Sequence, residues 1–144
     1  QRDLLARASR LDRTGGAVRR ATEARARGLR LRVVEELERA LAVDPANPAL
    51  LSEMGYAFYD LERRDLAYEY QRTALDVDPS FANAWYGLAL VHRDAGRSRA
   101  AVTCFRRFLE LEPEDAFAAR ARSEIARLTD AAAGRSRTPS DGVR

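Results

Sequence analysis

Few side chains in this sequence are suited to catalysis or to metal binding. The chain of 144 residues has one histidine, His92, and one cysteine, Cys104. A histidine base or a cysteine nucleophile needs a partner that activates it and a further group that orients the pair. The sequence offers no such set around either residue. A single histidine also argues against a histidine-based metal site, and a single cysteine excludes a disulfide within the chain.

Two other arrangements resemble functional sites and have simpler explanations. Asp60 and Asp94 are 34 residues apart and resemble a carboxylate pair. Both fall where we expect helix ends, and exposure to solvent there explains two acidic residues equally well. Gly15-Gly16 is not followed by Gly-Lys-Ser/Thr, so it indicates a break and not a phosphate-binding loop. We therefore predict that the protein is not an enzyme and has no cofactor and no metal.

Charge is distributed unevenly along the chain. All 25 cationic side chains are arginine, and hydrophobic residues make up 46%. Residues 1–32 have a net charge of +7, whereas residues 33–129 have −5. The basic segment either contacts an anionic partner, a nucleic acid or a membrane surface, or is attracted to the acidic body of its own chain. The second interpretation is the simpler one. No apolar run approaches the ~18 residues of a membrane span.

The elements that would hold any functional residue repeat along the chain. An acidic residue precedes proline three times at intervals of 34 residues, in the pairs Asp44-Pro45, Asp78-Pro79 and Glu112-Pro113. Proline cannot donate to a helix, and it disfavours helical backbone in the residue before it. Each pair therefore predicts the end of a helix, and a period of this length indicates a repeat architecture.

Each period contains two helical stretches. In the second unit Leu51, Met54, Gly55 and Phe58 have the spacing of one helix face, and Asn47 precedes them as an N-cap. We expect Asp65 to cap the next helix. That helix faces inward with Leu66, Ala67, Tyr70, Ala74 and Leu75. The third unit repeats the scheme with Trp85, Leu88, Ala89 and His92, then Ala101, Phe105, Phe108 and Leu109. No stretch has sustained period-2 alternation, so we expect no sheet.

These residues resemble the tetratricopeptide repeat pattern W-x2-L-G-x2-Y, A-x3-F, P over 34 residues. The third unit matches it with Trp85, Leu88, Ala89, His92, Ala101, Phe105 and Pro113. The second matches it with Leu51, Met54, Gly55, Phe58, Ala67, Gln71 and Pro79. The first is degenerate, with Ala17, Arg20, Ala21, Ala24, Val33, Leu37 and Pro45. The resemblance covers residues 17–129 and implies an all-α, right-handed superhelical solenoid of helix-turn-helix repeats.

The resemblance also divides the chain. We expect an Arg-rich N-terminal helix or cap in 1–16, a degenerate repeat in 17–47, and repeats in 48–81 and 82–115. A capping helix in 116–129, with Asp115 as its N-cap and Ala119, Ser123 and Ala126 inward, would close the solenoid. Residues 130–144 are small and polar, and we expect them to be disordered.

In this family the first helix of each repeat lines a concave groove. By the family's pattern, the candidate peptide-binding residues are Ser52, Tyr56, Tyr59, Asp60, Asn83, Tyr86, Leu90, Arg93, Asp94, Arg120, Glu124 and Arg127. The same pattern places Ala49, Phe117 and Leu128 there. Tyrosines provide contact area with a polar tip, asparagine pairs with a peptide backbone, and arginines hold carboxylates.

The resemblance implies a protein-interaction module that binds a segment of another protein, as an adaptor, an assembly factor or a secretion chaperone. Some members bind chaperone tails through a Lys/Asn/Arg clamp, but this chain has Val18, Thr22, Glu53, Asn83 and Gly87 at those positions. A role as an Hsp70- or Hsp90-tail adaptor is therefore disfavoured. Two alternatives stay open, an anionic partner of the basic segment and self-association through exposed repeat ends. A cytoplasmic location is the simpler expectation, although a first residue Gln1 leaves export open.

Overall fold

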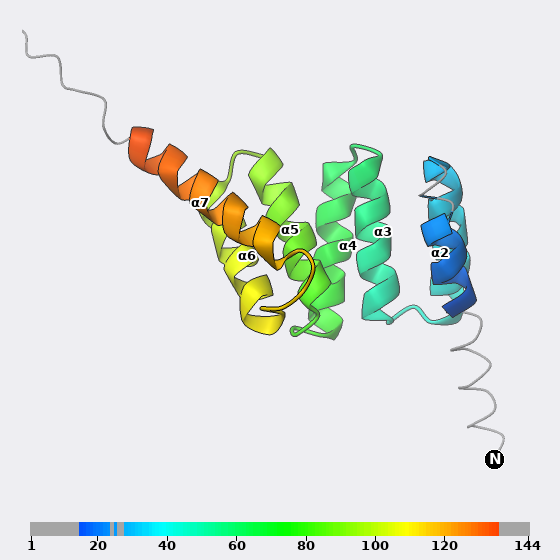
Figure 1. Ribbon diagram of the computed structural model, residues 1–144. Coiled ribbons are helices and arrows are strands. Elements are labelled where there is room, and N and C mark those ends of the chain that lie inside the picture. Colours follow the sequence, from blue (N-terminus) through cyan, green and yellow to red (C-terminus); the bar gives the residue numbers. More distant parts are fainter. Residues whose placement is uncertain (1–14, 24, 26–27, 136–144) are drawn as a thin grey trace, which may run out of the picture.

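The computed structural model describes residues 15–135 apart from 24, 26 and 27, and this part of the chain contains helices and no strand (Figure 1). Residues 15–23 are helical. The helices that follow are α2 (Arg30–Val43), α3 (Pro48–Asp60), α4 (Arg64–Val77), α5 (Ala82–Asp94), α6 (Ser98–Leu111) and α7 (Ala118–Arg135). The prediction of an all-α fold is confirmed. Neighbouring helices pack in chain order, and α3 also contacts α5.

The three acid-Pro pairs end helices in the same way. The amides of Asp44, Asp78 and Glu112 donate to the carbonyl oxygens of Ala40, Ala74 and Phe108, four residues earlier. Their φ angles of −138°, −138° and −136° are outside the helical region, as expected for a residue that precedes proline. Asn47 caps α3 as predicted, because its side chain accepts from the amides of Ala49 and Leu50.

The turn between the two helices of each repeat requires a left-handed residue. Gly28, Glu62 and Gly96 occupy equivalent positions, 34 residues apart, and have φ angles of 71°, 60° and 74°. Glycine adopts this conformation without strain, whereas glutamate does not. The turn after Glu62 also corrects one expectation. α4 begins at Arg64, so Asp65 lies in its first turn and is not its N-cap.

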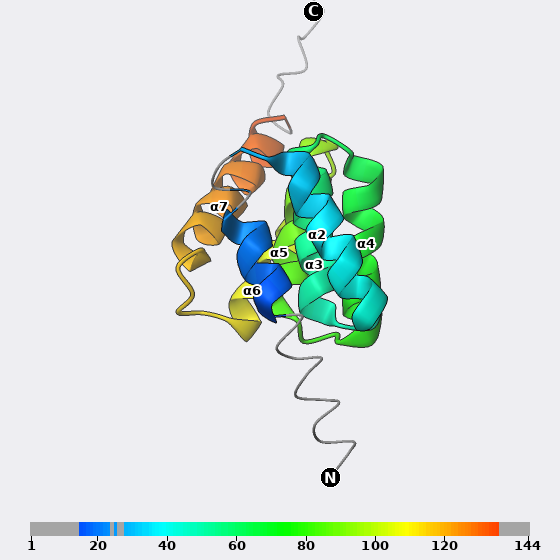
Figure 2. The same cartoon turned by 90° about the vertical axis from the view of Figure 1, so that its right-hand side faces the viewer.

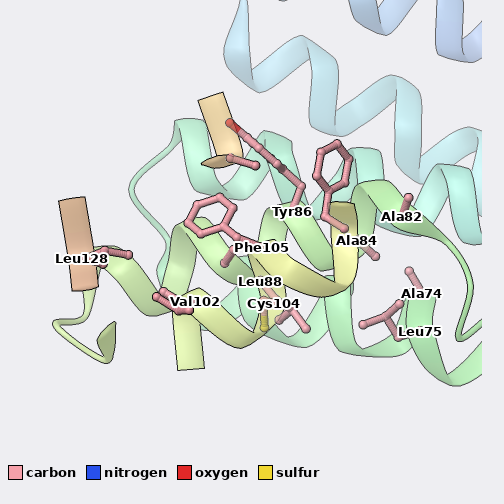
Figure 3. Close-up of a cluster of buried hydrophobic side chains, with 14 of the residues drawn as sticks. Ala74, Leu75, Ala82, Ala84, Tyr86, Leu88, Val102, Cys104, Phe105 and Leu128 are labelled. Atoms are coloured by element: carbon pink, nitrogen blue, oxygen red, sulfur yellow. The ribbon is translucent and has the colours of Figure 1, made fainter. Parts of the chain in front are cut away.

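The core lies between successive helix pairs (Figure 3). Phe105 and Phe108 of α6 are fully buried, and the Tyr86 ring of α5 lies against both, with centroid distances of 5.5 and 5.1 Å. A second cluster, which includes Val33, Leu37 and Leu50, joins the first repeat to α3. The core therefore continues from repeat to repeat, and each pair of helices buries its apolar face against the next.

A glutamine occupies the place where the family pattern has a large apolar residue. Gln71 of α4 is 1% exposed. Its amide nitrogen donates to the Ser52 carbonyl at 3.1 Å, and its amide oxygen accepts from the Ser52 hydroxyl at 2.8 Å. Ser52 was predicted to face the groove, and that prediction is wrong. Its hydroxyl faces α4 because the buried amide of Gln71 needs a partner.

Two glycines make room for this glutamine. A Cβ atom at Gly55 would lie 2.7 Å from the Gln71 amide nitrogen, and one at Gly87 would lie 2.3 Å from it. α3 and α5 therefore approach the same side chain from two directions. Only residues without a Cβ leave space for it at both positions. This packing fixes the distance between two helices that line the concave face.

The last helix differs from the prediction in its bounds and in its buried face. α7 begins at Ala118 and extends to Arg135, so residues 130–135 are helical and not disordered. Ala118, Ala121 and Leu128 are buried, whereas the expected inward residues Ala119, Ser123 and Ala126 are exposed. The expected positions would pack on a following helix, and within the described residues none follows α7. The tail from 136 to 144 lies outside the described residues.

The first repeat is only partly described. Of the predicted cap in 1–16, residues 1–14 lie outside the described residues, and Gly15 and Gly16 are helical, so they do not form the expected break. Leu31, at the start of α2, is 71% exposed. Viewed from the α2 end of the array, the first two helices cover that end of the core (Figure 2). Among the described helices, none is both long and apolar enough to cross a membrane.

Candidate functional site

A cavity of about 630 Å³ opens on the concave face between α3, α5 and α7. It brings together nine of the predicted groove residues from three helices, Tyr56, Tyr59, Asp60, Asn83, Tyr86, Leu90, Arg93, Arg120 and Glu124. Phe117, which precedes α7, also lines it as the family pattern implied. The register of the repeats produces this convergence, because equivalent positions of successive first helices face the same side.

Aromatic rings form one wall of this cavity. Tyr86 is only 6% exposed, since it packs on Phe105 and Phe108 and has the ring of Phe117 at 5.5 Å. The Tyr56 hydroxyl donates to the Asn83 carbonyl at 2.6 Å, and burial raises the Tyr56 pKa far above its usual value. Contacts within the protein therefore fix the side chains of Tyr56 and Tyr86 in place. Phe117, at 50% exposed, is the ring that offers the most surface to a ligand.

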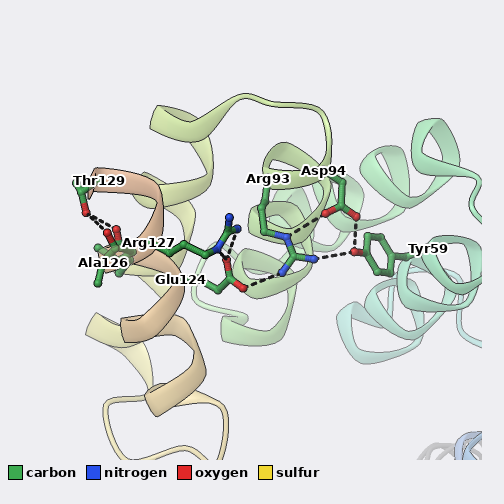
Figure 4. Close-up of polar contacts among 8 residues, drawn as sticks. Tyr59, Arg93, Asp94, Glu124, Ala126, Arg127 and Thr129 are labelled. Carbon is green, nitrogen blue, oxygen red and sulfur yellow. Dashed lines mark hydrogen bonds and ion pairs between the residues drawn. The ribbon is translucent and has the colours of Figure 1, made fainter. Parts of the chain in front are cut away.

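A chain of polar contacts crosses the concave face (Figure 4). The Tyr59 hydroxyl of α3 donates to Asp94 of α5 at 2.5 Å. Arg93 donates to Asp94, to the Tyr59 hydroxyl and to Glu124 of α7, at 2.9, 3.1 and 3.2 Å. Arg127 completes the chain with a 2.8 Å bond to Glu124. The three first helices α3, α5 and α7 are therefore tied together by charge-assisted hydrogen bonds.

The acidic members of this chain stay ionised. Partial burial alone would raise the pKa of Asp94, but the hydrogen bonds from Tyr59 and Arg93 hold it below its ordinary value. The pKa of Glu124 is also lowered, because the bonds from Arg127 and the charge of Arg93 outweigh the effect of burial. Burial and the bond to Asp94 raise the pKa of Tyr59, which keeps its proton.

Arg25 was not among the predicted residues, yet it lines the cavity at its N-terminal end. Its guanidinium contacts Glu53 and Asp60 of α3, both at 3.0 Å. Elsewhere in the basic segment, Arg20 pairs with Glu36 at 3.1 Å, and Arg30 donates to the Asp60 carbonyl at 2.9 Å. These described arginines contact the body of their own chain, as the simpler interpretation of the charge asymmetry predicts.

Arg120 differs from the other charged residues of the cavity. Arg25 and Arg93 are paired with Glu53, Asp60 and Glu124. Arg120 is exposed, and no carboxylate among the described residues pairs with it. Burial raises the pKa of Tyr86, and the charge of Arg120 together with its hydrogen bond to the Tyr86 side chain partly opposes that rise.

Three predicted residues do not line the cavity. Ser52 is buried against Gln71, and Asp94 and Arg127 are exposed partners of Arg93 and Glu124 outside the lining. Leu128 is buried in the core. Glu53 and Phe108 line the cavity without having been predicted to do so. Glu53 occupies one of the family's clamp positions, which is the signal in the sequence that could have identified it.

The histidine and the cysteine of the chain both lie within the helix packing. His92 packs edge-on against Tyr68 at 5.7 Å, and burial together with Arg97 and Arg72 lowers its pKa. Cys104 is buried in the core, and burial raises its pKa to about 11. Both residues therefore belong to helix packing. No group of three histidine, cysteine or acidic residues within the described ranges could hold a metal ion.

Comparison with known proteins agrees with this architecture. Two family profiles, each described as tetratricopeptide repeat, match residues 49–81 and 82–125, which together are more than half of the chain. The chain belongs to the tetratricopeptide repeat (TPR) family. Human tetratricopeptide repeat protein 7B is 33% identical over 75 residues, which are 52% of this chain and 9% of that protein. Human protein 7A is 34% identical over 73 residues, or 51% and 8%. The chain thus spans less than a tenth of these relatives.

Solved TPR domains have the same fold. The Sgt2 TPR domain of Aspergillus fumigatus superimposes with a TM-score of 0.78 at 24% identity, over 91% of this chain and 88% of that one. The first TPR domain of Spaghetti (RPAP3), bound to the HSP90 peptide SRMEEVD, gives 0.76 at 19% identity, over 85% and 94%. The fold is therefore the all-α, right-handed superhelical solenoid that the sequence resemblance implied. Tetratricopeptide repeats are protein-interaction modules, and this chain has their fold.

Proposed function

We propose that this TPR domain is an adaptor that binds a segment of another protein in the cavity between α3, α5 and α7. The observation that carries the proposal is the convergence of nine register-equivalent residues from three helices on one cavity of about 630 Å³. A cavity of this size with aromatic walls and a few polar groups suits a short peptide. The solved RPAP3 domain, which shares the fold, holds a peptide of HSP90.

The chemistry of this cavity differs from that of a chaperone-tail clamp. Glu53 has a negative charge at one of the clamp positions, and it is paired with Arg25. Gly87, at another, is closed off by the Gln71 side chain. The cationic side chains that would hold an acidic chaperone tail are therefore missing at these positions. The proposed partner is a different protein, and its site of binding is the aromatic wall and the C-terminal end of the cavity.

Partner capture with a blocked cavity tests this proposal. Asn83 is exposed on α5 and lines the cavity, so Asn83→Arg places a long charged side chain in the ligand's path without removing a core contact. Thr73 is exposed on α4, outside the lining residues, and Thr73→Arg is the matched control. A protein captured from source-cell lysate by wild type and by the control, but not by Asn83→Arg, would support the proposal.

The same experiment can reject it. If Asn83→Arg captures the same proteins in the same amounts as wild type, the cavity is not the interaction site. Thermal unfolding followed by circular dichroism must first show that all three proteins fold alike, because loss of capture by an unfolded variant has no bearing on the site.

A further inference from the structure

The charges of the cavity are almost fully paired with one another. Arg25 is held by Glu53 and Asp60, and Arg93 by Glu124 and Asp94. These pairs join α3 to the residues before α2 and to α5 and α7, so a ligand that displaced them would break contacts between repeats. A charged ligand gains little from groups that are already neutralised, because desolvating a paired charge costs free energy.

Arg120 is the cavity's available charge within the described residues. It is exposed in the first turn of α7, and no carboxylate there accepts from its guanidinium. Glu124, four residues later, is paired with Arg93 and Arg127, and Asp115, five residues earlier, accepts from the Phe117 amide at 2.8 Å. The Arg120 side chain has a hydrogen bond to the Tyr86 side chain but no carboxylate partner, and its remaining N–H groups can form a bidentate pair with a carboxylate of a ligand.

Phe117, the residue directly before α7, provides an apolar surface in the same cavity. It lies three residues before Arg120, and both side chains line the cavity. Its ring is half-exposed and is supported from below by Tyr86, at a centroid distance of 5.5 Å. An aromatic ring with one free face and a firm support is suited to stacking against another ring.

We infer that the cavity selects a segment that has one carboxylate beside an aromatic side chain, with Arg120 holding the carboxylate and Phe117 the ring. This inference rests on the proposed function and specifies its ligand. In the remainder of the cavity Arg25 and Arg93 are already paired with Glu53, Asp60 and Glu124, so a second carboxylate on the ligand would find no unpaired cation there. A cationic ligand would meet carboxylates that are already paired and would be repelled by Arg120.

The smallest probe with this chemistry is N-acetyl-phenylalanine, which has one carboxylate and one ring. Its amide, N-acetyl-phenylalaninamide, has the same shape without the charge. Both are titrated into the ¹⁵N-labelled chain at pH 7, and binding is followed from the amide shifts. A fragment of this size is expected to bind with a dissociation constant of about 1 mM. A charge-assisted bond should give the carboxylate an advantage of about tenfold over the amide.

Three variants assign the two roles. Arg120→Gln should reduce the tenfold preference to about one while leaving weak binding of both probes. Phe117→Ala should weaken both probes by a similar factor and keep the preference. Arg106→Gln removes an exposed arginine of α6 that does not line the cavity, and it should behave as wild type. The shifted amides should lie in α5 and α7.

Several results would overturn the inference. Equal affinity of wild type for the two probes, a preference that survives in Arg120→Gln, or the absence of binding at about 10 mM would each show that Arg120 and Phe117 do not select this chemistry. The proposed function is tested separately by the Asn83→Arg capture. If capture depends on the cavity but the probes show no preference, only the ligand assignment fails. If the probes show the preference but capture is unaffected by Asn83→Arg, the proposed function fails.

Discussion

Substitution of Gly87 tests whether Gln71 sets the spacing of the concave helices. In Gly87→Ala the new Cβ atom would lie 2.3 Å from the Gln71 amide nitrogen and 2.6 Å from the carbon that bears it. A flexible side chain would normally move away. Gln71 cannot do so, because Gly55 bounds it on the other side at 2.7 Å and Ser52 holds its amide by two hydrogen bonds.

The expected cost follows from three contributions. Overpacking a core costs about 1–3 kcal/mol, and displacing the Gln71 amide from Ser52 costs about 1–3 kcal/mol more if a buried group is left without a partner. Replacing a helical glycine by alanine returns about 1 kcal/mol. We therefore expect Gly87→Ala to lower the free energy of unfolding by about 3 kcal/mol.

A double-mutant cycle makes the prediction specific to this contact. Gln71→Ala alone leaves a void and the Ser52 hydroxyl unpaired, at a cost of about 2 kcal/mol or more. In the double variant the methyl group introduced by Gly87→Ala enters the space that Gln71 has left, so the two costs should not add. We expect a coupling of about 1–2 kcal/mol from urea unfolding monitored by circular dichroism. Gly87→Ala as stable as wild type, or additive losses, would refute the packing argument.

Three further predictions follow from the turns, the polar chain and the core. Glu62→Gly should raise the free energy of unfolding by about 0.5–1 kcal/mol, because Glu62 has a φ of 60° where the other repeats have glycine; a loss in urea unfolding would contradict this. Asp94 has a lowered pKa in the folded state, so its carboxylate contributes to the free energy of unfolding at neutral pH, and this contribution is lost as the pH falls below about 4. Asp94→Asn should therefore have a lower free energy of unfolding than wild type at pH 7, and the difference between the two should shrink in acid. Because the pKa of Cys104 is about 11, only roughly one thiol in a thousand is ionised at pH 8. Ellman's reagent should therefore react slowly with the native chain and fast with the chain unfolded in guanidinium chloride. Equal reaction rates under the two conditions would show that the core admits the reagent.

The helix boundaries were predictable because local chemistry sets them. The three acid-Pro pairs ended helices in the expected register, and Asn47 capped α3 through its own side chain. Such signals act over four residues or fewer, so a single sequence contains them in full. The bounds of α7 were less accurate. Its residues 130–135 have only alanine, glycine, arginine and aspartate, and helix propensity there is not visible as an apolar face.

The candidate site was predictable in position but not in the state of its residues. The repeat register placed Tyr59, Arg93 and Glu124 at one cavity, since a fixed period turns equivalent residues to the same side. It did not show that Arg93 is already occupied by three partners, nor that Arg25 pairs with Glu53 and Asp60 across 28 and 35 residues. Those pairings depend on the distance between helices, which no local pattern contains.

The sequence by itself therefore determined the period, the helix ends and the family, because these follow from residue spacing along one chain. The tertiary structure alone decided which polar groups are buried and which are free. Gln71 turned Ser52 away from the groove because a buried amide must be paired. Neutralisation of Arg25 and Arg93 left Arg120 available, since an ion pair forms only where folding brings two side chains within a few ångströms.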